Sequence, residues 1–146
     1  MLSLTHLSTG AALASRARYS LWTLPANLAL HFLLDAIPHW DLGTNFRKRG
    51  RLKTAFLEIF DLAAGFLLIF FFYQSGRPFS PLLWLNALVS ILPDLLEAPA
   101  NFLGFPLFRT LDRIHSGFFH HHAKSQILSL LLQTLLIAGS LAIAII

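Results

Sequence analysis

Two histidines and two aspartates lie within one short stretch of the chain that is otherwise almost entirely apolar. His31 and Asp35 are four residues apart, so on a helix their side chains project from the same face. Pro38 ends or kinks such a helix, which lets His39 and Asp41 fold back toward the same point. Imidazole and carboxylate are ligands for Zn²⁺, Mn²⁺, Fe²⁺ and Mg²⁺. The stretch therefore predicts a site for a divalent metal ion, with hydrogen-bonded His–Asp pairs as the alternative.

Further ionisable residues interrupt apolar segments elsewhere, where charge is costly unless it faces a protein interior or a water-filled cavity. Asp94 follows Pro93, so its backbone is predicted to be irregular, and we expect its carboxylate among the metal ligands. Asp61 lies deep enough to need a partner and is predicted to be a ligand or a general base. His115 is predicted to act as a general acid or base, with a phosphate contact or an ordinary solvated loop as alternatives.

Two arginines, Arg109 and Arg113, are one helical turn apart in a segment that mixes Phe with Arg and His. Their spacing suits the phosphate of a lipid headgroup. The excess of basic residues that membrane proteins carry in cytoplasmic loops explains the pair equally well. Glu97 is as compatible with a membrane interface as with the interior of a bundle.

Composition assigns the chain to the membrane proteins. Hydrophobic residues make up 55% and charged residues 12% of its 146 residues, with a mean hydropathy of +0.64, whereas soluble domains carry about 25% charged residues. The absence of cysteine excludes disulfides, thiolate nucleophiles and Cys-ligated metal centres. The net charge of +4 comes without a separate basic domain, which argues against nucleic-acid binding.

Four apolar segments have about the ~20 residues that cross a bilayer: residues 19–38, 54–74, 79–98 and 126–146. Residues 3–16 predict either a thin first helix or a re-entrant segment. Residues 75–78 are predicted to form a tight turn, and residues 101–124 an interfacial loop or a short amphipathic helix. The predicted fold is an all-α, polytopic integral membrane bundle in which residues 1–146 form a single domain.

The basic residues indicate how the bundle is oriented. Five of the 11 Lys and Arg residues fall in the loop 43–53, which the positive-inside rule places in the cytoplasm. If successive predicted spans cross the membrane in opposite directions from that loop, the acids and most of the histidines lie toward the inner face of the membrane. We therefore expect one cation site at that face, formed by His6, His31, Asp35, His39, Asp41 and Asp94.

Uncharged polar residues also recur at helical spacing along the predicted spans. Such stripes join membrane helices by hydrogen bonds, which is the interpretation for Asn27, Asn86, Ser90, Gln126, Ser129 and Gln133. The carboxylates need another explanation, because a lone ionised group in these surroundings costs several kcal/mol. Gly65 is predicted to allow another helix to approach closely.

These motifs together resemble a known family. The chain is similar to the YdjM-type family of predicted membrane-bound metal-dependent hydrolases in Thr5-His6 with Gly10, in His31…Leu34-Asp35-Ala-Ile-Pro38-His39-Trp40-Asp41, in Asp61-Leu-Ala-Ala-Gly65 and in Leu92-Pro93-Asp94. The resemblance covers about residues 5–116. The family usually has a His-Arg pair ahead of a Thr-His-Ser, whereas here Asp112-Arg113 precede His115-Ser116. The resemblance implies a small polytopic protein of the bacterial inner membrane with a metal site.

Three functions are compatible with these residues. The favoured one is metal-dependent hydrolysis of a phosphoester or lipid-derived substrate at the cytoplasmic face. A transporter or channel for divalent cations or protons would carry similar intramembrane acids and histidines, although the outer half offers no counterpart site beyond Asn27 and Asn86. The third is a non-catalytic membrane scaffold whose polar residues pair internally.

Overall fold

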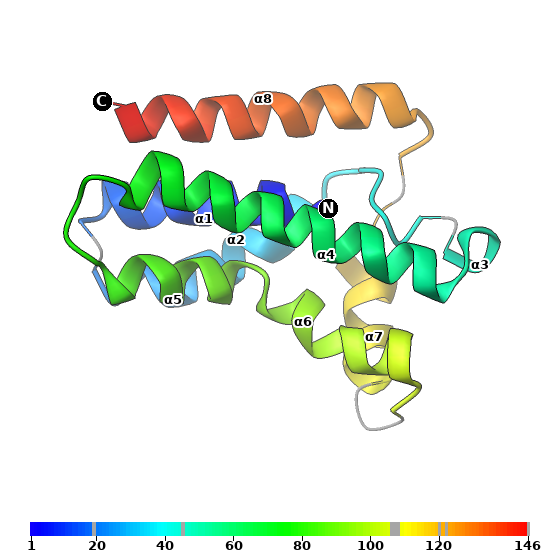
Figure 1. Ribbon diagram of the computed structural model, residues 1–146. Coiled ribbons are helices and arrows are strands. Elements are labelled where there is room, and N and C mark those ends of the chain that lie inside the picture. Colours follow the sequence, from blue (N-terminus) through cyan, green and yellow to red (C-terminus); the bar gives the residue numbers. More distant parts are fainter. Residues whose placement is uncertain (19, 45, 106–108, 120, 122, 146) are drawn as a thin grey trace.

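The computed structural model describes residues 1–18, 20–44, 46–105, 109–119, 121 and 123–145 (Figure 1). The elements in that part of the chain are all helical, as predicted. In order they are α1 (Ser3–Arg16), α2 (Thr23–Asp35), α3 (Phe46–Arg49), α4 (Arg51–Ile69), the π-helical turn η1 (Phe70–Gln74), α5 (Pro81–Ser90), α6 (Leu92–Ala98), η2 (Pro99–Leu103), α7 (Arg109–Ile114), η4 (His115–Phe119) and α8 (Gln126–Ile145).

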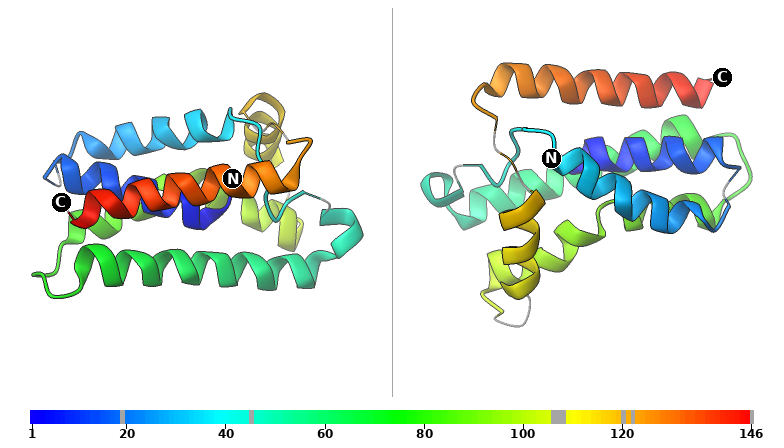
Figure 2. Two further views of the ribbon diagram at one scale, coloured as in Figure 1. Left: turned by 90° about the horizontal axis from the view of Figure 1, so that it is seen from above. Right: turned by 180° about the vertical axis from the view of Figure 1, so that it is seen from behind.

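Helix α1 is the central helix of the bundle and contacts α2, α4, α5 and α8 (Figure 2). Its buried positions carry mainly small side chains, which let the backbones of membrane helices approach closely. A Cβ atom added at Gly10 would lie 2.6 Å from Ser90 Cβ on α5. One added at Gly65 on α4 would collide with Leu7. The close approach predicted at Gly65 is confirmed, and the helix that approaches is α1.

Fewer helices are long enough to cross a membrane than the four that the sequence predicted. Among the described residues, two qualify by length and composition: Arg51–Gln74, which joins α4 and η1, and Gln126–Ile145. The pair Pro81–Ser90 and Leu92–Leu103 qualifies only as one span bent by 60°. The predicted span 19–38 is wrong as a full-length helix. Helix α2 has 13 residues, which extend only about 20 Å at ~1.5 Å per residue.

Prolines explain both departures. Pro38 disfavours helical backbone in the residue before it, and α2 already ends at Asp35. Pro93 lacks the N–H that would continue α5, and the chain breaks at Ile91, where φ is −117° and ψ is 5°. The predicted span 79–98 is therefore two helices. The irregular backbone expected beside Asp94 is confirmed.

The other predicted segments agree more closely with the helices of the structure. Residues 3–16 form α1, and the described part of residues 126–146 forms α8. The predicted basic loop 43–53 is partly helical, because it contains α3 and α4 begins before it ends. The predicted interfacial segment 101–124 contains α7 and η4. Residues 75–78 form a turn, as predicted, with Gly76 at a φ of 71°.

Polar side chains join the helices, as their spacing predicted. Asn27 Nδ2 on α2 donates to Asn86 Oδ1 on α5 at 2.7 Å. Gln133 Oε1 on α8 accepts a hydrogen bond from the Thr5 hydroxyl on α1 at 3.3 Å. Gln126, by contrast, is exposed. Hydrogen bonds between uncharged side chains therefore connect α2 with α5 and α1 with α8.

The outward faces of the two long helices are apolar. Large hydrophobic side chains are exposed along them, among them Phe56, Ile59, Phe60, Ile127, Leu128, Leu131 and Leu135. Monomeric soluble proteins rarely expose an apolar surface this extended. The surface is compatible with an integral membrane protein.

The tight contact at Gly10 predicts a selective loss of stability. In Gly10→Ala the new methyl group collides with Ser90, and overpacking of this kind costs about 1–3 kcal/mol. The matched control is Gly139→Ala in α8, where no described atom lies within 4 Å of the added Cβ and the helix propensity improves. We expect thermal unfolding in detergent to show a lower melting temperature for Gly10→Ala alone. Equal melting temperatures would contradict the close packing of α1 against α5 at Gly10.

Candidate metal centre

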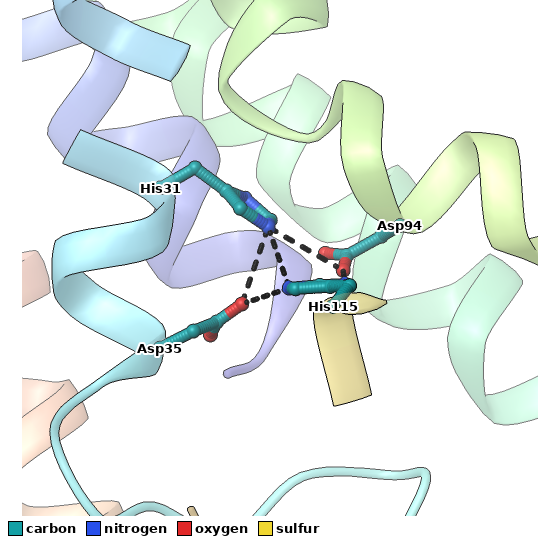
Figure 3. A group of neighbouring side chains, drawn as sticks. All are labelled: His31, Asp35, Asp94 and His115. Atoms are coloured by element: carbon teal, nitrogen blue, oxygen red, sulfur yellow. Dashed lines mark hydrogen bonds and ion pairs between the residues drawn. The ribbon is translucent and has the colours of Figure 1, made fainter. Parts of the chain in front are cut away.

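Four side chains with metal-binding atoms come together from three elements (Figure 3). His31 and Asp35 lie on α2, Asp94 lies on α6 just after the helix break, and His115 begins η4. One ligand atom from each residue lies within 4.8 Å of those of the other three. The Asp35 side chain is completely buried, and that of Asp94 is 29% exposed. These four residues are called the cation group below.

The distances within the cation group suit a metal ion. His31 Nε2 lies 3.2 Å from both His115 Nε2 and Asp35 Oδ2. His115 Nε2 lies 2.8 Å from the same carboxylate oxygen, and Asp94 Oδ1 lies 3.7 Å from His31 Nε2. Ligand atoms at ~2.0–2.1 Å around a tetrahedral Zn²⁺ are about 3.3–3.4 Å apart. Small shifts would therefore seat a divalent ion among these atoms, so the residues present fit a metal.

Hydrogen bonds to groups outside the cation group hold the imidazoles of His31 and His115 in the orientation that a metal ligand needs. His31 Nδ1 donates to the Ser90 carbonyl at 2.8 Å, because a carbonyl oxygen can only accept. His115 Nδ1 donates to Glu97 Oε1 at 2.5 Å. With the proton of each ring on Nδ1, Nε2 is the atom that each ring directs at the cation group. Metal-bound histidines in proteins carry outer partners of this kind.

The charges of the site are set by Asp35. Burial would raise the pKa of Asp35, but hydrogen bonds from His115 and two further imidazoles hold that pKa far below its usual value. Burial would lower the pKa of His115, but its bonds to Asp35 and Glu97 outweigh burial and raise the pKa from 6.5 to about 10. For His6, burial lowers the pKa more than the hydrogen bond to Asp35 raises it, and the pKa falls to about 4. At neutral pH, without a bound metal, Asp35 is ionised, His115 is protonated and His6 is neutral.

The other oxygen of Asp35 faces a second set of groups. The Met1 amino nitrogen lies 2.7 Å from Asp35 Oδ1 and 2.8 Å from His39 Nε2. His6 Nε2 lies 3.1 Å from Asp35 Oδ1, and Asp41 Oδ2 lies 3.3 Å from His39 Nε2. Three further predicted ligands, His6, His39 and Asp41, are thus buried beside the cation group.

A cavity of about 700 Å³ adjoins both sets of residues, a volume typical of small-molecule sites. Asp94, Glu97 and His115 line it, and so do Met1 and Asp41. Much of the remaining wall is apolar and comes from α4, α6 and η2, with Ile59, Leu62, Leu95, Phe102 and Leu103 among its side chains.

Three predicted site residues take other places. Asp61 Oδ2 accepts a hydrogen bond from the Leu4 N–H at 3.3 Å, so this carboxylate caps the start of α1 and lies outside the cation group. Arg109 and Arg113 are exposed on α7 and are absent from the described lining of the cavity. His115, for which a role as general acid or base stays a prediction, is a member of the cation group.

Glu97 is the residue beside the cation group whose place the sequence left undecided. Its side chain is buried, and its carboxylate holds His115 Nδ1. Glu97 follows Asp94 by three residues, which places both on one face of α6, and this spacing was the available signal. Its partner lies on another element, which no spacing within α6 could indicate.

Comparison of the chain with family models, with curated proteins and with solved structures finds no match. The resemblance to the YdjM-type family therefore stays a prediction from the residues themselves. What the site can do chemically follows from its own geometry.

Metal uptake is expected to release a proton. With a pKa of about 10, His115 is protonated at pH 7, and an ion that binds its Nε2 must displace that proton. The apparent affinity for Zn²⁺ should then rise about tenfold per pH unit between pH 7 and 8.5, because protons compete less as the pH approaches the pKa of His115. Titration calorimetry in buffers of different protonation enthalpy measures both quantities. The exposed His121→Ala control should behave like the wild type, and an affinity independent of pH would contradict the assignment.

Proposed function

We propose that this protein is a polytopic membrane hydrolase that uses a divalent metal ion to cleave a phosphoester or lipid-derived substrate at the cytoplasmic face of a bacterial inner membrane. The observation that carries the proposal is the largely apolar cavity that adjoins the buried cation group. The resemblance to the YdjM-type family supports the same reaction class and location.

The cavity supports a substrate that has both an apolar and a polar part. Side chains such as Leu62 and Phe102 would pack against a hydrocarbon chain, whereas Asp94 and His115 would lie beside the polar group that reacts. The apolar outer faces of α4 and α8 support the supply of such a molecule from surrounding lipid.

The residues of the site divide the chemistry between them. A divalent metal ion, when bound, lowers the pKa of a water molecule and polarises the bond to be cleaved. Asp94 contributes Oδ1 to the cation group, and its partly exposed side chain leaves the second oxygen to accept a proton from the attacking water. Glu97 retains the proton on His115 Nδ1 and so keeps Nε2 directed at the cation group.

A direct assay tests the reaction. Purified protein in mixed micelles with Mn²⁺ is expected to cleave at least one of three probes: a phosphatidic acid, an acyl ester and a long-chain alcohol diphosphate. Chelation and the substitution His31→Ala should each reduce the release of phosphate or fatty acid at least about 100-fold, because loss of even an outer partner of a metal ligand lowers activity by up to about that factor. The control substitution His121→Ala should leave the release unchanged. Bound metal without cleavage, together with Mn²⁺ flux into liposomes, would favour a transporter. Absence of bound metal would favour a scaffold.

The orientation can be tested cleanly because the chain has no cysteine. Lys48 and Ser75 are both exposed, at opposite ends of the span Arg51–Gln74. If the loop 43–53 is cytoplasmic, a membrane-impermeant maleimide added to intact spheroplasts should label Ser75→Cys and leave Lys48→Cys unlabelled. Permeabilised cells serve as the control, in which both variants should react. The reverse labelling pattern would contradict the proposed location of the site.

A further inference from the structure

The carboxylate of Asp35 has different partners on its two oxygens. Oδ2 lies 2.8 Å from His115 Nε2 and 3.2 Å from His31 Nε2, inside the cation group. Oδ1 lies 2.7 Å from the Met1 amino nitrogen and 3.7 Å from His39 Nε2. A completely buried carboxylate with positively charged or metal-binding groups on both oxygens has the form of a bridging ligand.

The groups around Oδ1 are arranged like a second set of metal ligands. His39 Nδ1 donates to the Ile37 carbonyl at 2.8 Å, so the neutral ring presents a lone pair at Nε2. Asp41 Oδ2 lies 3.3 Å from that nitrogen. Thr44 holds the other oxygen of Asp41 through its N–H at 2.7 Å and its hydroxyl at 3.0 Å. Both side chains are therefore fixed with one acceptor directed at the same point as Asp35 Oδ1.

A cationic group lies at that point. The Met1 amino nitrogen is 2.8 Å from His39 Nε2 and 3.9 Å from Asp41 Oδ2, in addition to its contact with Asp35 Oδ1. The position thus holds a positive charge among three acceptors. A divalent ion would take the place of the ammonium charge when the Met1 nitrogen moves aside or gives up its proton to solvent.

The cavity connects the two positions. Asp94 and His115 from the cation group line it, and so do Met1 and Asp41 from the second set. Its described lining contains four carboxylates, Asp41, Glu58, Asp94 and Glu97, and no Lys or Arg. These carboxylates outnumber the two positive groups of the lining, the Met1 ammonium and the protonated His115, so the cavity without bound ions disfavours a phosphoester. A substrate of that charge requires bound cations, and a pair of ions can stabilise both the attacking and the leaving oxygen.

We propose that Asp35 bridges two divalent cations, the first in the cation group and the second between His39 and Asp41. The inference rests on the proposed function and extends it, because it assigns the substrate to the anionic phosphoesters. His6, which contacts Asp35 Oδ1 from α1, positions the bridging carboxylate.

Metal counting tests this arrangement without an activity assay. The purified chain is loaded with Mn²⁺, desalted and analysed by elemental analysis and by electron paramagnetic resonance. We expect about two manganese ions per chain with an exchange-coupled spectrum, as for paired ions ~3.5–4 Å apart. His39→Ala and Asp41→Asn should each retain about one ion with an uncoupled spectrum. His121→Ala is the matched control, because it removes an exposed imidazole and keeps the carbonyl that accepts the His39 N–H.

The possible outcomes separate the two proposals. One ion per chain in the wild type, lost in His115→Ala and unchanged in His39→Ala, would overturn the second position and leave the proposed hydrolase intact. No bound ion in the wild type would overturn both. Helical circular dichroism and a monodisperse elution profile establish that each variant is folded, and Asp41→Asn decides the question if His39→Ala is not.

Discussion

A carboxylate with no exposed surface, Asp35, is the constraint on which the rest of the structure depends. An ionised group buried without partners costs several kcal/mol, and the cost falls only when hydrogen-bonding and charged groups surround it. Those groups come from parts of the chain far apart in sequence, with His6 on α1 and His115 on η4. The position of α2 is therefore tied to those of α1 and η4. The same arrangement places a negative charge among imidazoles, which is what a divalent cation requires.

Irregular backbone next to the site supplies the groups that orient its rings. The break between α5 and α6 lies at Ile91, and the neighbouring Ser90 carbonyl accepts the proton of His31 Nδ1. The chain unwinds after α2, and the Ile37 carbonyl does the same for His39 Nδ1. Prolines near both points interrupt the helical hydrogen bonds that would otherwise use such carbonyls. The residues that shorten the helices are therefore also responsible for the protonation pattern of the site.

Local signals in the sequence predicted the part of the site that depends on local geometry. The spacing of His31 and Asp35 on one helical face, and the prolines beside His39 and Asp94, indicated correctly which side chains gather. The place of His115 in the cation group was not predictable, because it depends on a contact with Asp35 across 80 positions of the chain. The number of spans was overestimated for a similar reason, since apolar length does not show where a helix stops. Nor did hydropathy indicate that the short segment 3–16 is the central helix, because its small residues contribute through close packing.

The central position of α1 bears on how the protein is made. Helix α1 precedes in the sequence every helix that surrounds it, so the ribosome delivers it before α4, α5 and α8 exist. With 14 residues and buried polar groups such as His6 and Thr5, it is too short to remain across a bilayer alone. The contacts of α1 with α8 can form only after that later helix has been synthesised. The packing around α1, and with it the enclosure of the His6 side chain, is therefore completed late.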